Sequence, residues 1–251
     1  MSRRAGAIPL TFLAGAIFIA ACVDIPTGAD DILSIQFDPL PSPSVVVGDS
    51  LRDTLGFVKP VSFKAFNFSG DEVSNPPVTF STVDRGIRVD PAKGFVLGDS
   101  VRSGARVFAD VGGLTASVMV SVSLRPDTII GSNDRDSLSY VLTDTVSVSN
   151  PLGVRVLHVG TTDTSSVAFY LVSFKIVSHT DTAFAQLVSD AGTQSSLDTT
   201  DTGGVGARRI RINLKKLTTL TDSVIVQALV KYRGVNVRGS PARLVLKVKP
   251  K

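Results

Sequence analysis

The chain has 251 residues, of which 26 are Lys or Arg and 22 are Asp or Glu, and its formal net charge is +4. Glu72 is the only Glu, Trp is absent, and Val, Thr, Ser, Asp and Gly are abundant. Helical surfaces need straight-chain residues such as Glu, whereas β-branched residues favour strands and Asp, Gly and Ser favour turns. The composition therefore excludes a mainly helical protein and predicts an all-β fold.

The first 21 residues have the three zones of a secretory signal peptide. Arg3 and Arg4 supply positive charge, residues 8–19 are almost wholly apolar, and Ala20 and Ala21 are small. The apolar stretch is shorter than the ~20 residues that a transmembrane helix needs. We therefore expect residues 1–21 to be an export signal that is removed from the mature protein.

The segment from Ile19 to Cys22, Ile-Ala-Ala-Cys, resembles the lipobox of bacterial lipoproteins. The resemblance implies that the chain is cut before Cys22 and that its sulfur is acylated, which makes Cys22 a lipid anchor in the membrane. One acyl chain binds a membrane only marginally, so two or three are needed for a durable anchor. Val23 stands where Asp often retains such proteins in the inner membrane, so the resemblance implies an outer-membrane location.

Cysteine usage and charge agree with an exported chain. Cys22 is the only Cys, so no leftover thiol would meet an oxidising compartment. Cleavage before Cys22 removes two of the 26 basic residues and no acid, which leaves 24 basic against 22 acidic residues. This near balance does not predict nucleic-acid binding, which needs a concentrated basic footprint.

After a short tether over residues 22–31, alternation of apolar and polar residues predicts a first domain over residues 32–124. The clearest strand is Leu114–Leu124, and it forms a hairpin with Ala105–Ala109 through Gly112 and Gly113. Earlier strands are predicted at Ile32–Phe37, Ser44–Val47, Val61–Phe66, Val78–Ser81 and Ile87–Val89.

A break at Arg125, Pro126 and Asp127 separates a second series of strands, because proline cannot continue a central ladder. Short strands in two series predict two tandem sandwiches, the second over residues 125–251. The strands of the second series are predicted at Val167–Val177, Arg208–Leu214, Val224–Tyr232 and Arg243–Lys249.

Several segments resemble bacterial immunoglobulin-like domains. In the first domain, residues 44–49, 78–82, 93–98 and 104–109 resemble the group 2 kind, with Phe80 where that family often has Trp. In the second, residues 172–176, 196–207 and 224–228 resemble the invasin-like group 1 kind more loosely. The resemblance implies two tandem immunoglobulin-like β-sandwich domains after a lipoprotein signal peptide, but such folds serve many functions.

One short pattern occurs twice, as Val-Gly-Asp-Ser-Leu-Arg over residues 47–52 and Leu-Gly-Asp-Ser-Val-Arg over residues 97–102. A duplicated ligand-binding loop is one interpretation. We favour turns at both places, in which Gly supplies a positive φ and Asp bonds nearby backbone N–H groups.

Little in the sequence predicts catalysis, a cofactor or a metal. His158 and His179 are the only bases for a hydrolytic triad, and neither lies near a nucleophile elbow. Two separated His and no free Cys disfavour zinc. The Asp134/Asp136 and Asp198/Asp201 pairs could bind calcium, but we favour acidic turns without metal, because Arg135 opposes cation binding and no EF-hand spacing is present. We therefore predict no enzyme activity and no cofactor.

The remaining functional signal is positive charge near the C-terminus. If one sheet gathers these cations, they form a face for anionic glycans or lipid headgroups. The alternative, which we favour, is that these Lys and Arg side chains lie on the solvent-exposed faces and edges of antiparallel strands, where they discourage edge-to-edge aggregation. The candidate contacts for an anionic ligand are Arg208, Arg209, Arg211, Lys215 and Lys216.

These observations support a non-enzymatic structural or adhesive module of the cell envelope, with polysaccharide or an envelope protein as its contact. An accessory subunit of a secretion or surface assembly is the alternative, and a hydrolase using His158 or His179 is a third, less favoured hypothesis.

Overall fold

The computed structural model describes residues 31–178, 184–217 and 221–251, which form strands, turns and one short 3-10 helix, with no α-helix among them. Cys22, the rest of residues 1–30 and His179 lie outside the described residues. Within those three ranges, no helix is long and apolar enough to cross a membrane. The prediction of an all-β fold built of two sandwiches is confirmed.

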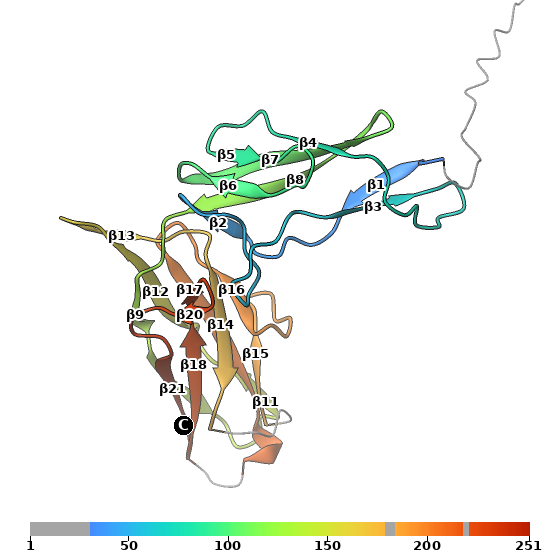
Figure 1. Ribbon diagram of the computed structural model, residues 1–251. Coiled ribbons are helices and arrows are strands. Elements are labelled where there is room, and N and C mark those ends of the chain that lie inside the picture. Colours follow the sequence, from blue (N-terminus) through green and yellow to red (C-terminus); the bar gives the residue numbers. More distant parts are fainter. Residues whose placement is uncertain (1–30, 179–183, 218–220) are drawn as a thin grey trace, which may run out of the picture.

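The first sandwich contains a four-stranded sheet in the order β2-β8-β7-β4. In this sheet β2 runs parallel to β8, and the other pairs are antiparallel. Two ribbons, β1-β3 and β5-β6, accompany it (Figure 1). Its strands are β1 (Ser34–Phe37), β2 (Ser44–Val46), β3 (Phe63–Phe66), β4 (Thr79–Ser81), β5 (Ile87–Val89), β6 (Val96–Gly98), β7 (Arg102–Val111) and β8 (Leu114–Ser123).

The core of the first sandwich forms because alternate residues of these strands are apolar. Val107 on β7 and Val120 on β8 are completely buried between the layers. Phe63 from β3 meets Phe80 from β4 edge to face, with ring centroids 5.9 Å apart. Phe80 is thus a buried aromatic residue in the core of the first sandwich.

The second sandwich has a five-stranded sheet in the order β10-β21-β18-β14-β16 and a six-stranded sheet built around β11-β17-β12-β13, with β15 beside β17 and β9 beside β12. The first of its sheets joins β10 parallel to β21. Its elements are β9 (Thr128–Asn133), β10 (Arg135–Tyr140), β11 (Val146–Val148), β12 (Leu152–Val159), β13 (Thr164–Ser166), β14 (Leu171–Ile176), β15 (Ala185–Val188), β16 (Leu197–Thr199), β17 (Val205–Asn213), the 3-10 helix η1 (Leu214–Lys216), β18 (Asp222–Leu229), β19 (Lys231–Tyr232), β20 (Val235–Asn236) and β21 (Ala242–Pro250).

Each sandwich has its own hydrophobic core, and the two clusters of buried residues share no member. The core of the second sandwich is filled from both of its sheets, for example by Ile210 on β17 and Leu246 on β21. The chain passes from one sandwich to the other between Ser123 and Thr128. The first sandwich lies across one end of the second (Figure 1).

Each of the predicted strands has a counterpart in the structure, and several of them were predicted too long. The hairpin through Gly112 and Gly113 is confirmed, with φ angles of 56° and 85°. The strand predicted over Val167–Val177 begins only at Leu171, because Phe169 adopts a left-handed φ of 61°. The strand predicted over Val224–Tyr232 ends at Leu229, and a separate small ribbon follows it.

The core of the second sandwich predicts a large effect of one truncation. Leu246 is completely buried, so Leu246→Ala should lower the free energy of unfolding by about 2–5 kcal/mol through lost burial and a residual cavity. The adjacent Lys247 points to solvent, and Lys247→Ala should change the free energy of unfolding by less than about 0.5 kcal/mol. Urea denaturation of both variants measures the difference, and equal effects would contradict the assigned register.

Candidate functional site

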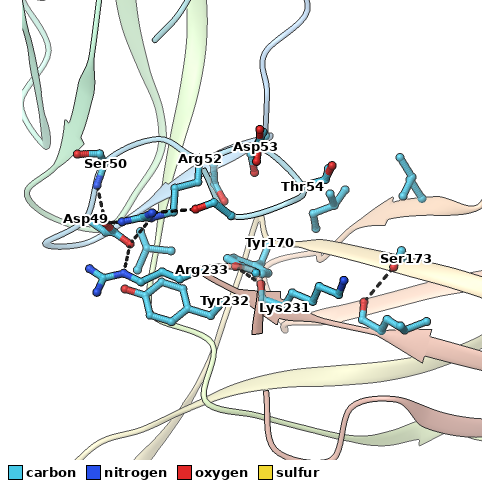
Figure 2. A pocket seen from close by; sticks show the side chains of 18 residues that line it. Asp49, Ser50, Arg52, Asp53, Thr54, Tyr170, Ser173, Lys231, Tyr232 and Arg233 are labelled. Atoms are coloured by element: carbon cyan, nitrogen blue, oxygen red, sulfur yellow. Dashed lines mark hydrogen bonds and ion pairs between the residues drawn. The ribbon is translucent and has the colours of Figure 1, made fainter. Parts of the chain in front are cut away.

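The two sandwiches meet at a cleft lined by residues from both of them. The first sandwich contributes the loop between β2 and β3, and the second contributes β14, β16, the end of β18 and the β19-β20 hairpin. Figure 2 shows the polar side chains that converge there, among them Asp49, Arg52, Tyr170, Lys231 and Arg233.

The carboxylate of Asp49 lies at the centre of this contact, with only 5% of its side chain exposed. Its Oδ1 accepts hydrogen bonds from the backbone N–H of Ser50 and from Nη2 of Arg52, both at 2.9 Å. Its Oδ2 accepts from Nε of Arg52 at 3.0 Å and from Nε of Arg233 at 2.9 Å. Because Arg233 belongs to the second sandwich, one carboxylate ties the two sandwiches together.

The surroundings of Asp49 keep it ionised. Burial raises the pKa of Asp49, but the hydrogen bonds from Arg52, Arg233 and Ser50 together lower it by more, so this pKa lies well below its usual range. Bonding to the Asp49 carboxylate in turn raises the pKa of both Arg52 and Arg233. The group is therefore an anion held between two cations.

A close approach of two glycines completes the contact. Gly56 of the first sandwich has φ of +94°, and a Cβ there would lie 2.2 Å from the backbone N of Gly234. Arg233 and Gly234 form the turn of the β19-β20 hairpin with φ angles of 52° and 80°, as a two-residue hairpin turn with positive φ requires. Arg52 also donates from Nη1 to the carbonyl of Gly56 at 2.8 Å, which holds the glycine loop in place. We call Asp49, Arg52, Gly56, Arg233 and Gly234 the joint.

Two tyrosines lie beside the joint and support the hairpin. The hydroxyl of Tyr170 donates to the carbonyl of Lys231 at 2.6 Å, and burial raises the pKa of Tyr170. Burial and then the neighbouring Asp49 carboxylate raise the pKa of Tyr232. The guanidinium of Arg233 lies 5.2 Å from the ring centroid of Tyr232, a cation-π distance. Both phenols therefore stay neutral and fix the hairpin that carries Arg233.

The repeated Gly-Asp-Ser pattern has two different structural roles. The two segments lie side by side, with the N–H of Gly48 donating to the carbonyl of Gly98 at 2.8 Å. Gly48 has the expected positive φ of 75°, but the turn prediction was wrong for Gly98, which ends β6. There a Cβ would lie 2.7 Å from the carbonyl oxygen of Val46, so close backbone approach requires the glycine. Asp99 pairs with Arg88 at 2.9 Å, whereas Asp49 belongs to the joint.

A second set of contacts fixes the short segment that connects the sandwiches. The Asp127 carboxylate accepts from Nε of Arg125 at 2.7 Å and from the backbone N–H of Val159 at 3.0 Å. It also lies 2.6 Å from Nδ1 of His158, which is 3.1 Å from the carbonyl of Arg125. Burial raises the pKa of Asp127, but these hydrogen bonds lower it overall. The connecting segment is thereby bonded to β12.

The Asp127–His158 pair resembles two members of a hydrolytic triad but has a structural role here. In a triad the ring nitrogen that does not face the acid accepts a proton from a nucleophile. In the described part of the chain, the hydrogen-bond partners of His158 are Asp127 and the carbonyl of Arg125, both at Nδ1. His179, the other base considered for a hydrolase, lies outside the described residues.

The cations predicted to contact an anionic ligand do not share one face. Arg209 and Arg211 point to the wet side of β17, where they bond to the Asp190 carboxylate at 2.9 Å and to the carbonyl of Gly192 at 2.8 Å. Arg208 alternates to the opposite side, is 10% exposed and pairs with Asp198 at 2.8 Å. Lys215 and Lys216 are exposed on η1, after the end of β17. A role of these five residues in ligand binding stays a prediction.

The acidic pairs considered for calcium bond to protein groups instead. Asp136 accepts from the backbone N–H of Asn150 at 3.2 Å, and Asp201 accepts from that of Val205 at 2.9 Å. Residues 31–178, 184–217 and 221–251 contain no cluster of three or more His, Cys, Asp or Glu side chains suited to a metal.

Comparison with known proteins gives only distant structural matches. No family model matches this chain, and no curated protein matches it. Among solved structures, domains 4 and 5 of the S-layer protein SbsC are 14% identical, with a TM-score of 0.31, over 88% of this chain and 98% of that one. The Yersinia pseudotuberculosis adhesin InvE is 12% identical, with a TM-score of 0.35, over 88% of this chain and 61% of that one. Because these identities and TM-scores are low, the fold assignment rests on the strands and hydrophobic cores of this chain itself.

The glycine contact predicts that a single methyl group will separate the sandwiches. Gly56→Ala should displace the β2-β3 loop from the β19-β20 hairpin, because its Cβ would clash with backbone atoms that cannot rotate away. Small-angle scattering of the purified protein should show a broader distribution of shapes. Gly70→Ala is the matched control, because Gly70 has a similar φ of +83° but open space around its Cβ position. Identical scattering from both variants would contradict a close joint.

The ionisation of Asp49 predicts a pH-dependent contribution to stability. At pH 7, Asp49→Asn should lower the free energy of unfolding by about 1.5–3 kcal/mol, the value of hydrogen bonds to a charged group. The native pKa of Asp49 is depressed, so its contribution is complete above the unfolded pKa of about 3.9 and is lost as pH falls through the native pKa. Urea titrations should therefore show a constant difference between wild type and variant from pH 7 to about pH 5 and a narrowing one below. A difference that widens on acidification would disprove this assignment.

Proposed function

We propose that this chain is a lipid-anchored, non-enzymatic module of a bacterial cell envelope, in which two rigidly joined sandwiches hold a binding surface away from the membrane. The observation that carries the proposal is the double attachment between the sandwiches, through Asp49 on the β2-β3 loop and through Asp127 on the connecting segment.

The double attachment matters because domains joined by one segment usually move relative to each other. Here the connecting segment is hydrogen-bonded to β12, and the loop that carries Asp49 makes a separate contact with the β19-β20 hairpin. Two points of attachment at different places in the chain oppose both bending and twisting. A fixed shape is useful to a spacer or a presenting module, whereas an enzyme would need a catalytic constellation.

The anchor in this proposal is supported by the sequence of residues 1–22. The charged start, the apolar stretch and Ile19-Ala20-Ala21-Cys22 together resemble a lipoprotein signal, and Val23 favours the outer membrane. The segments similar to group 2 and group 1 bacterial immunoglobulin-like domains are consistent with a structural or adhesive role at that site. The partners we propose are the membrane, through the acylated Cys22, and an envelope polysaccharide or protein.

The anchor is tested by replacing one atom. Cys22→Ser should release the protein from the membrane fraction, because the serine oxygen cannot become the thioether that carries the diacylglycerol. Mass spectrometry of wild-type protein extracted from membranes should find acyl chains on an N-terminal Cys22. Ala21→Ser is the control, since it keeps a small residue before the cut and should remain anchored. An intact leader, or an unmodified thiol at Cys22, would remove this part of the proposal.

Cross-linking in intact cells separates the proposed role from its alternative. A spacer or polysaccharide-binding module should yield no single protein in stoichiometric amount. A subunit of a secretion or surface assembly should yield one such partner, and that result would replace the proposed role.

A further inference from the structure

One face of the second sandwich has a charge pattern that differs from the rest of the protein. Successive residues of a strand point to opposite faces of a sheet, so the neighbours of buried residues point outward. In β21 the residues Leu244, Leu246 and Val248 are buried, and in β18 Val224, Val226 and Ala228 are buried. The outward positions of the five-stranded sheet are therefore Arg135, Ser137 and Ser139 on β10, Arg243, Val245, Lys247 and Lys249 on β21, Ser223, Ile225, Gln227 and Leu229 on β18, Leu171, Ser173 and Lys175 on β14, and Leu197 and Thr199 on β16.

These outward positions include cations and no acid. The cations are all exposed, and among the described residues none of them forms an ion pair. On a wet sheet face, residues of opposite charge commonly lie across from one another on neighbouring strands. We call the set the cationic face: Arg135, Lys175, Arg243, Lys247 and Lys249.

The cross-strand neighbours of four of these cations are hydroxyls or an amide, and the neighbour of Arg135 is Val245. Lys247 lies between Ser137 on β10 and Ser223 on β18. Lys249 lies beside Ser139, and Gln227 lies between Arg243 and Lys175. Neutral hydrogen-bonding groups thus alternate with positive charge across the sheet.

Protection of a sheet edge does not explain the arrangement. Charged residues, Lys above all, are common on edge strands because they prevent pairing with another chain. However, β21 is an interior strand, with β10 on one side and β18 on the other. Three of the five cations lie on this strand, where the backbone is already paired.

The cations also form a line. Arg243 and Lys249 are six residues apart on β21, which corresponds to about 20 Å along the strand. Between them Val245 interrupts the series, and at that level Arg135 of the neighbouring strand supplies the charge. A flat face with charges in a row, flanked by hydroxyl and amide groups, is complementary to an extended polymer with repeated negative charges and hydroxyls.

We propose that the cationic face binds a linear anionic polysaccharide, with the cations contacting its carboxylate or phosphate groups and the serines and Gln227 contacting its hydroxyls. This inference deepens the proposed binding role and does not depend on the lipid anchor.

Binding to polygalacturonate, a linear polymer with one carboxylate per sugar, tests the proposal, with neutral dextran as the polymer control. The full-length protein should bind polygalacturonate and not dextran, and its affinity should fall as salt is raised from 50 to about 150 mM, because exposed charges are screened. The triple variant Arg243→Gln, Lys247→Gln, Lys249→Gln should bind at least about tenfold more weakly. All three side chains point to solvent, so its circular dichroism and urea midpoint should match wild type.

A matched variant separates a specific face from net charge. Arg155→Gln, Lys231→Gln, Arg238→Gln removes the same number of exposed cations from elsewhere on the second sandwich and should keep wild-type affinity within about twofold. The proposal would be overturned if this control variant lost as much affinity for polygalacturonate as the β21 triple variant, or if the β21 triple variant lost none. Binding to vesicles of phosphatidylglycerol without binding to polygalacturonate would also overturn it, in favour of a lipid surface. Because the assay needs neither acylation nor a rigid joint, its outcome is independent of the tests of the proposed function.

Discussion

The contact between the β2-β3 loop and the β19-β20 hairpin depends on one buried carboxylate. Asp49 accepts hydrogen bonds from a guanidinium of its own sandwich and from a guanidinium of the other, and each of its oxygens accepts two hydrogen bonds. Burying a carboxylate is costly unless it is paired and hydrogen-bonded. Ser50 and Arg52 of its own sandwich supply three of the four hydrogen bonds, and Arg233 supplies the fourth. Separation of the sandwiches would break the bond to Arg233, so this charged hydrogen bond opposes their separation.

The rest of the joint brings the guanidinium of Arg233 within hydrogen-bond distance of the Asp49 carboxylate. Arg233 occupies a left-handed position in a tight hairpin, and Gly234 beside it allows Gly56 to approach at backbone distance. Tyr170 holds the hairpin through the carbonyl of Lys231. Small residues allow the backbones to approach and charged residues supply attraction, which together give a polar contact between the sandwiches.

The two sheets of the second sandwich use positive charge differently. On β17 the arginines are bonded within the protein, to Asp198, Asp190 and the carbonyl of Gly192. On β21 the cations face solvent beside serines and a glutamine. Arginines with partners stabilise the fold, whereas cations without partners on a flat face remain available to a ligand.

The sequence by itself determined the all-β fold class and the Gly112-Gly113 hairpin, because alternation with a period of two and turn chemistry are local properties. It also indicated positive charge in the last third of the chain. It did not indicate which cations are paired, because Arg208 and Arg209 look alike in sequence but alternate to opposite faces of β17. Asp49 was recognisable as a turn residue, but its role in the joint depends on Arg233, which lies 184 residues away. Only the tertiary structure brings those two side chains together, since no local pattern records a contact at that separation.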